Sequence, residues 1–157
     1  MDSLLDFYLQ PGYIYANDEG SLVKTVLGSC VAVCLWDQRQ GFGGMNHYIY
    51  PRRVQKPPRA EFGDVSIPYL IKLMKKIGSD EKDLLAHIVG GAANPLLSSN
   101  IGQENIAVAE EILERYGITV VNRSVGGNTG KKVVFNTASG ELLIYSCMQV
   151  REDDWYE

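Results

Sequence analysis

The sequence predicts one layered α/β domain, of the α+β kind, in which a largely antiparallel sheet packs against about two main helices. The chain has 157 residues, which is the length of one ordinary domain. Short apolar runs separated by turn residues fill residues 13–50 and 118–145, and two segments between them repeat apolar residues with the period of a helix. Strands, then a helix, a strand, a helix and a last group of strands build such a layered domain.

The N-terminal part is predicted to consist of strands joined by tight turns. Its apolar runs are short and bounded by Gly, Pro, Asn and Asp, which are turn residues. The predicted strand-like runs are 7–9, 13–15 and 22–23, with turns at 11–12 and 17–20.

Residues 25–50 predict a β-hairpin whose short polar turn is centred on Gln38 and Arg39. With a turn of even length at this place, Cys30 lies directly opposite His47. Directly opposed residues share a face of the sheet, with Cβ atoms roughly 5 Å apart. The hairpin therefore predicts a thiol within reach of an imidazole, whereas a turn of odd length would send the two side chains to opposite faces.

The first helix is predicted to begin at Ser66, as N-cap, and to end at Gly78. Pro68 falls in its first turn, where proline is tolerated. One apolar stripe predicts the face that packs on the core. Its members are Ile67, Leu70, Ile71, Met74 and Ile77, and a strand over 84–89 follows.

The second helix is predicted from Asn100 to about Tyr116, with Gly117 ending it. Gln103 stands three residues after Asn100, as in a capping box. A strand over 118–125 and a hairpin complete the domain, and the acidic end is expected to fray. The hairpin joins 133–135 to 142–145, and the end is 151–157.

Composition limits the function classes. Hydrophobic residues make up 45% of the chain and charged residues 22%, which is typical of folded globular proteins. The formal net charge of −4 gives no reason to expect binding to nucleic acid or to an anionic membrane surface. We find neither a basic leader nor an apolar run near the length of a membrane span, and three cysteines without framework spacing indicate reduced thiols, so we expect a cytoplasmic protein.

The residues around Cys30 favour nucleophilic catalysis. A thiol with the ordinary pKa of about 8.5 is mostly protonated at neutral pH, and an adjacent imidazole shifts it toward the nucleophilic thiolate. His47 supplies that imidazole. Thr25 can hold the imidazole in one orientation through its hydroxyl, which is the role of the third member of a catalytic triad.

Gly28 and Ser29 form a bend of little bulk before Cys30, which is expected to let a substrate approach the sulfur. Backbone N–H groups there can receive a developing oxyanion. We assign substrate or oxyanion contacts to Gly28, Ser29 and Asn46. The alternative is that Cys30 is a small buried hydrophobe, as free cysteines often are; Cys34, in an apolar run, fits that description.

Two other site types fit poorly, so we expect no metal and no cofactor. Residues 126–132 look like a phosphate-binding loop, but the second glycine has the wrong spacing, the final Ser or Thr is missing, and a strand follows. Cys30, Cys34, His47 and His87 could in principle bind zinc. However, Cys30 and Cys34 on one strand lie about two strand repeats apart, which suits chelation poorly.

Several motifs, in this order, resemble the CheD family of bacterial chemotaxis proteins, the chemoreceptor glutamine deamidases. The resemblance covers about residues 10–145. It implies a single CheD-like deamidase domain over 1–157 with a cysteine-deamidase-like sandwich fold, and a catalytic set of Cys30, His47 and Thr25. The motifs are Thr25-Val26-Leu27-Gly28-Ser29-Cys30-Val31-Ala32-Val33-Cys34-Leu35, Gly43-Gly44-Met45-Asn46-His47-Tyr48-Ile49-Tyr50-Pro51, Ile88-Val89-Gly90-Gly91-Ala92, Ile101-Gly102-Gln103-Glu104-Asn105 and Gly126-Gly127-Asn128.

The resemblance also implies an activity and partners. The expected reaction is hydrolysis of selected glutamine side chains of methyl-accepting chemoreceptors, in their cytoplasmic domains, through a thioester on Cys30. The same groups could cleave glutamyl methyl esters, and a CheC-type phosphatase is the implied regulatory partner. Lys131, Lys132 and His87 depart from the family pattern at places that could alter substrate or partner preference.

Two other functions stay open. The chain could be a binding module that retains the fold and associates with a receptor or phosphatase without catalysis. It could also be a cysteine protease or a transglutaminase-like acyl transferase, which would release a peptide or incorporate an amine instead of converting glutamine to glutamate.

Overall fold

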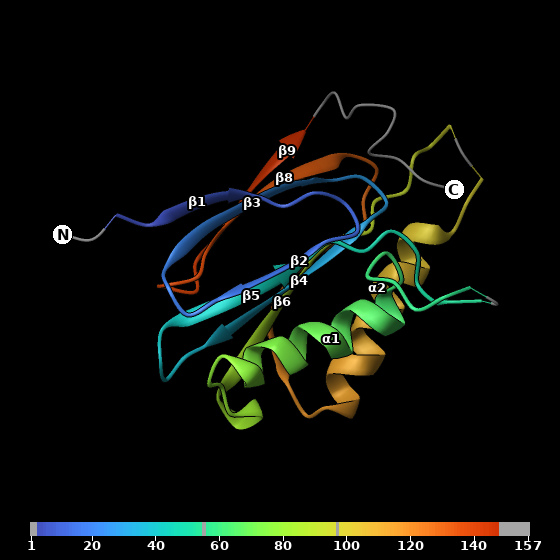
Figure 1. Ribbon diagram of the computed structural model, residues 1–157. Coiled ribbons are helices and arrows are strands. Elements are labelled where there is room, and N and C mark those ends of the chain that lie inside the picture. The colour runs from blue at the N-terminus through green and yellow to red at the C-terminus, as the bar shows by residue number, and fades with distance from the viewer. Residues whose placement is uncertain (1–2, 55, 97, 148–157) are drawn as a thin grey trace.

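The computed structural model describes residues 3–54, 56–96 and 98–147. They form three layers: a four-stranded sheet, a five-stranded sheet and two helices (Figure 1). The predicted layered α/β class is therefore confirmed. The predicted frayed end, 151–157, lies outside the described residues.

The strands divide between the two sheets rather than forming one. The four-stranded sheet has the order β1 (Leu5–Tyr8), β3 (Ser21–Leu27), β8 (Gly130–Asn136), β9 (Leu142–Cys147). The five-stranded sheet has the order β2 (Ile14–Asn17), β5 (Phe42–Asn46), β4 (Val31–Asp37), β6 (Leu84–Gly90), β7 (Thr119–Val125). Among the described strands, the β1–β3 and β6–β7 pairings are parallel and the others antiparallel, as the largely antiparallel prediction requires.

The β4–β5 hairpin forms, but its register differs from the prediction. Val31 and Tyr48 are opposed and joined by two hydrogen bonds of 3.2 and 3.0 Å. This displaces the register by two residues, so the predicted direct pairing of Cys30 with His47 is wrong. A shift of two preserves the face to which each side chain points, and Cys30 and His47 become diagonal neighbours.

The reason for the shift lies in the turn. The carboxylate of Asp37 accepts the backbone N–H groups of Arg39 and Gln40, at 3.0 and 2.9 Å. Gly41 then adopts a positive φ of 76°. These contacts place the turn one residue later than predicted, because an aspartate that bonds the backbone two residues on fixes where the chain reverses.

The first helix, α1 (Gly63–Lys76), begins three residues before the predicted N-cap. The N–H groups of Gly63 and Asp64 donate to the carbonyls of Tyr50 and Pro51, at 2.7 and 3.0 Å. Distant backbone therefore satisfies the first turn in place of a capping side chain. The end of the helix is as predicted, with Gly78 at a φ of 119°.

The second helix, α2 (Ile101–Arg115), has the predicted extent but not the predicted cap. The side chain of Asn100 makes no capping hydrogen bond, and the hydroxyl of Ser99 accepts the N–H of Ile101 at 3.1 Å. Gly117, at a φ of 71°, ends the helix as predicted. A short 3-10 turn, η1 (Glu81–Asp83), precedes β6.

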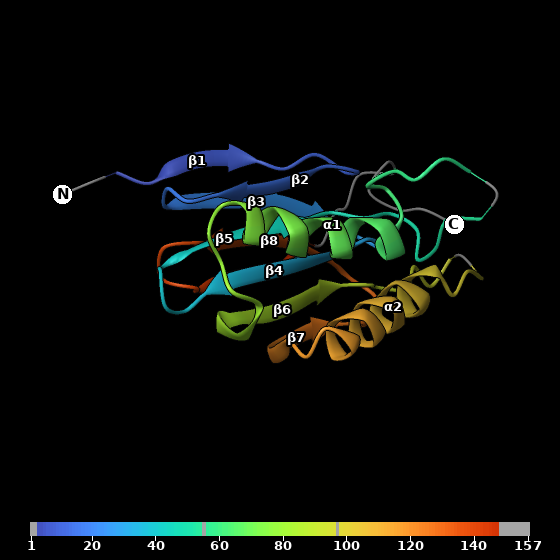
Figure 2. The same cartoon turned by 60° about the horizontal axis from the view of Figure 1, so that its bottom comes forward.

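Two apolar cores hold the layers together. One lies between the five-stranded sheet and the helices, where α1 packs on β2 and β5 and α2 packs on β6 and β7 (Figure 2). The other lies between the two sheets and includes Cys30, Met45 and Phe135. Within the described residues, no helix is both long and apolar enough to cross a membrane.

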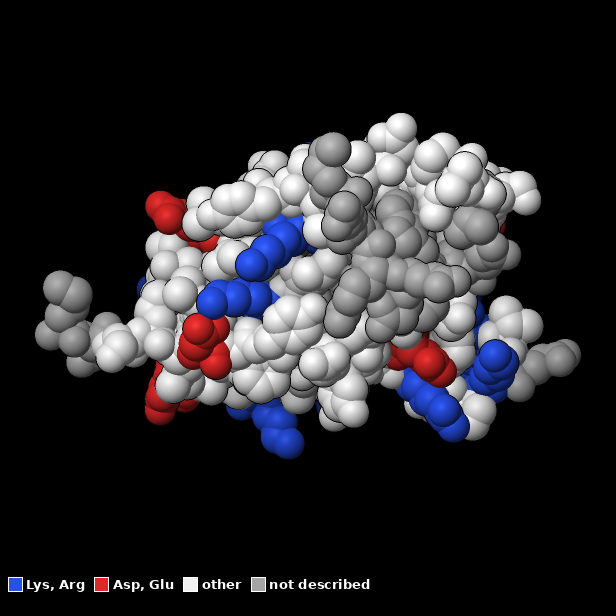
Figure 3. All heavy atoms as spheres, turned by 90° about the horizontal axis from the view of Figure 1, so that it is seen from above, with Lys and Arg blue, Asp and Glu red and all other residues white. Residues whose placement is uncertain are grey.

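The outer face of the four-stranded sheet carries charges of both signs. Figure 3 shows this side, where basic and acidic side chains stand near one another among uncharged residues. Lys24 and Asp6, for example, form an exposed ion pair of 3.1 Å. The described part of this face shows no broad basic patch of the kind that binds a phosphate backbone.

Candidate functional site

The site is built across the two sheets, from Thr25 and His47. Thr25 lies on β3, and its side chain points into the space between the sheets. His47 follows β5 in the other sheet and reaches across the same space. The Thr25 Oγ1 lies 2.7 Å from the Nδ1 of His47, and both residues are buried. The structure thus brings together two of the residues that the sequence singles out.

A second hydrogen bond fixes the direction of this contact. Thr25 Oγ1 donates to the backbone carbonyl of Leu9, at 2.9 Å. A hydroxyl has one proton to donate, so Thr25 must accept from Nδ1–H of His47. In the neutral imidazole the lone pair is then on Nε2, which is the nitrogen that can accept a proton from a nucleophile.

Cys30 lies in the bend between β3 and β4, where the carbonyls are held by the end of β6. The N–H of Gly91 donates to the carbonyl of Cys30 at 2.8 Å, and the N–H of Ala92 to that of Gly28 at 3.0 Å. Gly90 has a φ of 106°, and a Cβ there would lie 2.3 Å from the carbonyl oxygen of Cys30. The Gly-Gly-Ala motif is therefore the surface against which the bend packs.

Asn105, on α2, is a site residue that the sequence analysis missed. Its Nδ2 donates to the carbonyl of Ser29 at 3.0 Å and to that of Ile49 at 2.9 Å. Its backbone carbonyl accepts the hydroxyl of Tyr48 at 2.5 Å. A signal was present, because Asn105 stands four residues before the apolar Ala109, and residues at this spacing share one face of a helix. A polar side chain on a buried face needs a partner.

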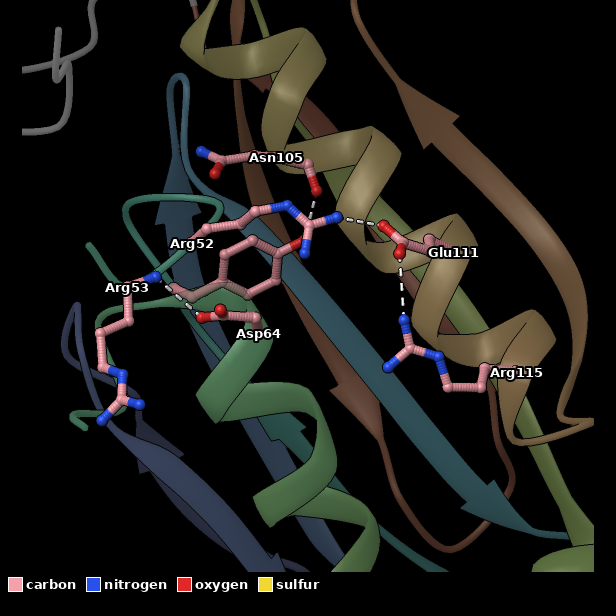
Figure 4. Close-up of polar contacts among 7 residues, drawn as sticks. Arg52, Arg53, Asp64, Asn105, Glu111 and Arg115 are labelled. Atoms are coloured by element: carbon pink, nitrogen blue, oxygen red, sulfur yellow. Dashed lines mark hydrogen bonds and ion pairs between the residues drawn. The ribbon is translucent and has the colours of Figure 1, made fainter. Parts of the chain in front are cut away.

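The segment after His47 is also tied to the helices by charged side chains. Arg52 pairs with Glu111 of α2, which in turn pairs with Arg115 at 3.0 Å. The backbone N–H of Arg53 donates to Asp64 of α1 at 3.0 Å. Figure 4 shows these contacts beside Asn105, so the chain leaving the site is held by both helices.

Burial is deeper than the sequence predicted. Cys30 and His47 are each 1% exposed, and Gly28 and Ser29 are buried as well. The expectation that the bend leaves the sulfur open to a substrate is therefore wrong for this structure. The residues that follow β6, together with Asn105, bond the carbonyls of this bend.

Burial also shifts the acid–base properties of the site. It lowers the pKa of His47 to about 4, so the imidazole is neutral at neutral pH. Burial, and after it a charge on Cys30, raise the pKa of Tyr48 well above its ordinary value. Burial raises the pKa of the Cys34 thiol, which makes Cys34 an unreactive thiol.

Asn46 occupies a place in the sheet. Its side-chain oxygen accepts the backbone N–H of Val33, at 2.7 Å, where the β4–β5 ladder is interrupted. The carboxamide oxygen of Asn46 thus takes the place of a backbone acceptor for β4. His87 lies elsewhere: its Nε2 donates to the carbonyl of Gly140 at 2.9 Å, and its ring packs edge-on against Phe135.

Metal ligands do not gather in the described part of the chain. No group of three or more His, Cys, Asp or Glu residues there could hold a metal ion. Cys34 lies in the β4–β6 ladder opposite His87, whereas His47 is bonded to Thr25.

Comparison with known proteins points to one family. A family model described as CheD, chemotactic sensory transduction, matches residues 50–146. A protein of Trichlorobacter lovleyi named probable chemoreceptor glutamine deamidase CheD is 39% identical over 143 residues, covering 88% of each chain. A protein of Anaeromyxobacter dehalogenans named probable chemoreceptor glutamine deamidase CheD 1 is 38% identical over 142 residues, covering 87% of this chain and 82% of that one.

Proposed function

This chain belongs to the CheD family, and on that premise we propose that it is a chemoreceptor glutamine deamidase with Cys30 as its nucleophile. The proposed substrates are glutamine side chains in the cytoplasmic domains of chemoreceptors, in agreement with the names of the relatives. The products are glutamate and ammonia. Each conversion adds one negative charge to the receptor, which makes the reaction suitable for adjusting a signalling state.

The contact between Thr25 and His47 is the observation that carries the proposal. The Nδ1–H of the buried His47 donates to Thr25, whose hydroxyl donates to the carbonyl of Leu9. These two hydrogen bonds fix Nε2 as the basic nitrogen. Such orientation of the base by a third group is typical of nucleophilic catalysis. Burial lowers the pKa of His47 to about 4, so the imidazole is unprotonated at neutral pH and Nε2 carries a lone pair that can accept a proton.

The first half of the proposed reaction forms a thioester. The proton of the Cys30 thiol goes to Nε2 of His47, and the sulfur attacks the carboxamide carbon of the glutamine. Backbone N–H groups near Ser29 and Cys30 stabilise the negative oxygen of the tetrahedral intermediate. His47 then returns its proton to the departing nitrogen, so that ammonia leaves and the carbon–nitrogen bond breaks.

The second half releases glutamate. His47 takes a proton from a water molecule as the water oxygen attacks the thioester carbon. The carbon–sulfur bond breaks, and the proton on His47 returns to the sulfur, which restores the starting enzyme. Thr25 keeps the same hydrogen bond to Nδ1 throughout. The same groups can cleave a glutamyl methyl ester, with methanol as the leaving group in place of ammonia.

A binding module is the second candidate, and the burial of the site favours it. Cys30 is 1% exposed, so a receptor glutamine reaches the sulfur only if the residues packed around it open. In this reading the chain associates with a receptor or with a CheC-type phosphatase without chemistry. In the enzymatic reading a CheC-type phosphatase competes with the receptor for the same face.

The test is incubation of the full chain with a purified chemoreceptor cytoplasmic domain, followed by mass spectrometry of its peptides. We expect specific glutamines to gain the mass that accompanies exchange of NH2 for OH, with the receptor chain intact. Cys30→Ala and His47→Ala should abolish the change, and Cys34→Ala, the matched cysteine control in the same core between the sheets, should retain it. Binding without any conversion would support the second candidate.

A further inference from the structure

We propose that Asn105 is a positioning residue. It holds the bend that contains the nucleophile (residues 28–30, the nucleophile bend) at a fixed separation from the segment that contains the base (residues 47–49, the histidine segment). The inference rests on the proposed function and deepens it. Asn105 lies outside the predicted catalytic set of Cys30, His47 and Thr25. Its two amide protons reach two different chain segments, one on each side of the site.

The first contact fixes the peptide that precedes the nucleophile. Asn105 donates to the carbonyl of Ser29 at 3.0 Å. This carbonyl belongs to the same planar peptide as the N–H of Cys30, so its direction sets the direction of that N–H. The neighbouring carbonyls of Gly28 and Cys30 are held by the end of β6. Asn105 thereby completes the set of contacts that orient the bend.

The second contact fixes the segment that carries the base. Asn105 donates to the carbonyl of Ile49 at 2.9 Å, two residues after His47. The residue between them, Tyr48, donates its hydroxyl to the backbone carbonyl of Asn105. The histidine segment is therefore bonded to Asn105 at two successive residues, through the side chain of Tyr48 and through the backbone carbonyl of Ile49.

The orientation of the amide is unambiguous. Both acceptors are backbone carbonyls, which only accept, so the group facing them must be the NH2 of Asn105. Its Oδ1 is buried and has no hydrogen-bond partner among the described residues. An unpaired buried acceptor costs stability that an apolar side chain would not. An apolar side chain would fill this space at a lower cost in stability, so the amide is better explained by its hydrogen bonds to the two carbonyls.

The experiment compares Asn105→Leu with Ile112→Ala in the receptor deamidation assay. Leucine has a similar size and removes both donors. Ile112 lies on the same helix and is buried in the core between the helices and the five-stranded sheet, so its substitution serves as a control for loss of stability. We expect Asn105→Leu to lower kcat roughly 10- to 100-fold with KM nearly unchanged, because small misplacement of reacting groups has effects of this size. Ile112→Ala should retain kcat below its unfolding temperature.

A second readout does not depend on turnover. The rate of alkylation of Cys30 by iodoacetamide, followed against pH, reports how closely the thiol and His47 are held. With Asn105→Leu the midpoint should differ from that of the wild type, because the separation of the two groups changes, and with Ile112→Ala it should stay. Asn105→Ser, which is smaller and keeps one donor, should lie between wild type and Asn105→Leu, and it replaces Asn105→Leu if that variant does not fold.

The outcomes separate this inference from the proposed function. If kcat and the alkylation profile are the same in the Asn105 variants as in Ile112→Ala, Asn105 is a packing residue and the inference is wrong. If the wild-type chain converts no glutamine but the alkylation midpoint shifts only in the Asn105 variants, the positioning role stands and the deamidase proposal fails.

Discussion

At the scale of single residues, the hydrogen bond from His47 to Thr25 decides which imidazole nitrogen is basic. Residue type and triad logic could predict Thr25 as the orienting residue, since a hydroxyl on a neighbouring strand is a suitable partner. The sequence could not show that Leu9 takes the hydroxyl proton. That contact depends on where residues 9–13 lie after β1, which local patterns do not determine.

Replacement of Thr25 by valine tests this contact, because valine has the same shape without the hydroxyl. The Nδ1–H of His47 would lose its buried acceptor, which should cost about 1–3 kcal/mol of unfolding free energy. Deamidation should fall roughly 10- to 100-fold as the imidazole loses its fixed orientation. Thr25→Ser keeps the hydroxyl and should retain most activity. Equal activity in Thr25→Val and wild type would contradict the role assigned to Thr25.

The lowered pKa of His47 predicts a dependence of stability on pH. The group binds a proton near pH 6.5 when unfolded but only near pH 4 when folded, so the unfolded state binds more protons between these values. Stability is therefore full above pH 6.5 and falls by about 3 kcal/mol as the pH drops to 4. Urea unfolding of wild type and His47→Gln should show this difference in slope, with His87 present in both. Parallel curves would show that His47 is not buried as a neutral group.

At the scale of elements, the hairpin shows what patterns determine and what they do not. Apolar runs and turn composition predict that the β4–β5 hairpin exists, and the parity of the turn predicts that Cys30 and His47 share a face. The exact register depends on Asp37, whose carboxylate serves the turn and also accepts the hydroxyl of Ser79, at 2.7 Å. Ser79 is distant in sequence, so this contact has no local signal.

Asp37→Ala should therefore destabilise the protein. It leaves the N–H groups of Arg39 and Gln40 and the hydroxyl of Ser79 without their acceptor, which should cost about 2–4 kcal/mol. Asp18→Ala, at an exposed position, is the matched control and should change stability by less than about 0.5 kcal/mol. Urea denaturation measures both. If the two variants unfold alike, Asp37 does not set the turn.

The limits of the helices likewise include ends that local patterns predict and a start that distant contacts determine. The ends of both helices are predictable, because Gly78 and Gly117 adopt the positive φ values that glycine allows. The start of α1 is not, since Tyr50 and Pro51 supply its acceptors from outside the helix. Sequence patterns therefore locate a helix end set by one residue better than a helix start set by tertiary contacts.

At the scale of the whole molecule, the site exists because two sheets face each other. The class of fold and its mostly antiparallel pairing are predictable from the order of elements. The division of strands between two sheets is not, because an amphipathic or apolar strand carries no mark of the sheet it joins. Thr25 and His47 come from different sheets, so the packing between the sheets determines their distance.

Phe135 lies in this packing, fully buried between the sheets. Phe135→Ala should lower the free energy of unfolding by about 3–5 kcal/mol, and Phe135→Leu by considerably less, since leucine fills more of the space. Chemical denaturation of the three proteins gives the values. A loss near zero for Phe135→Ala would mean that the sheets do not depend on this core.

The central claim is that His47, oriented by Thr25, makes Cys30 the reactive thiol, and the most direct measurement is the iodoacetamide labelling rate of each cysteine at neutral pH. Peptide mapping separates the three thiols. We predict that Cys30 reacts faster than the partly exposed Cys147, that buried Cys34 reacts slowest, and that Thr25→Val or His47→Gln slows Cys30 alone. A Cys30 as slow as Cys34, with a rate unaffected by either substitution, would contradict the claim.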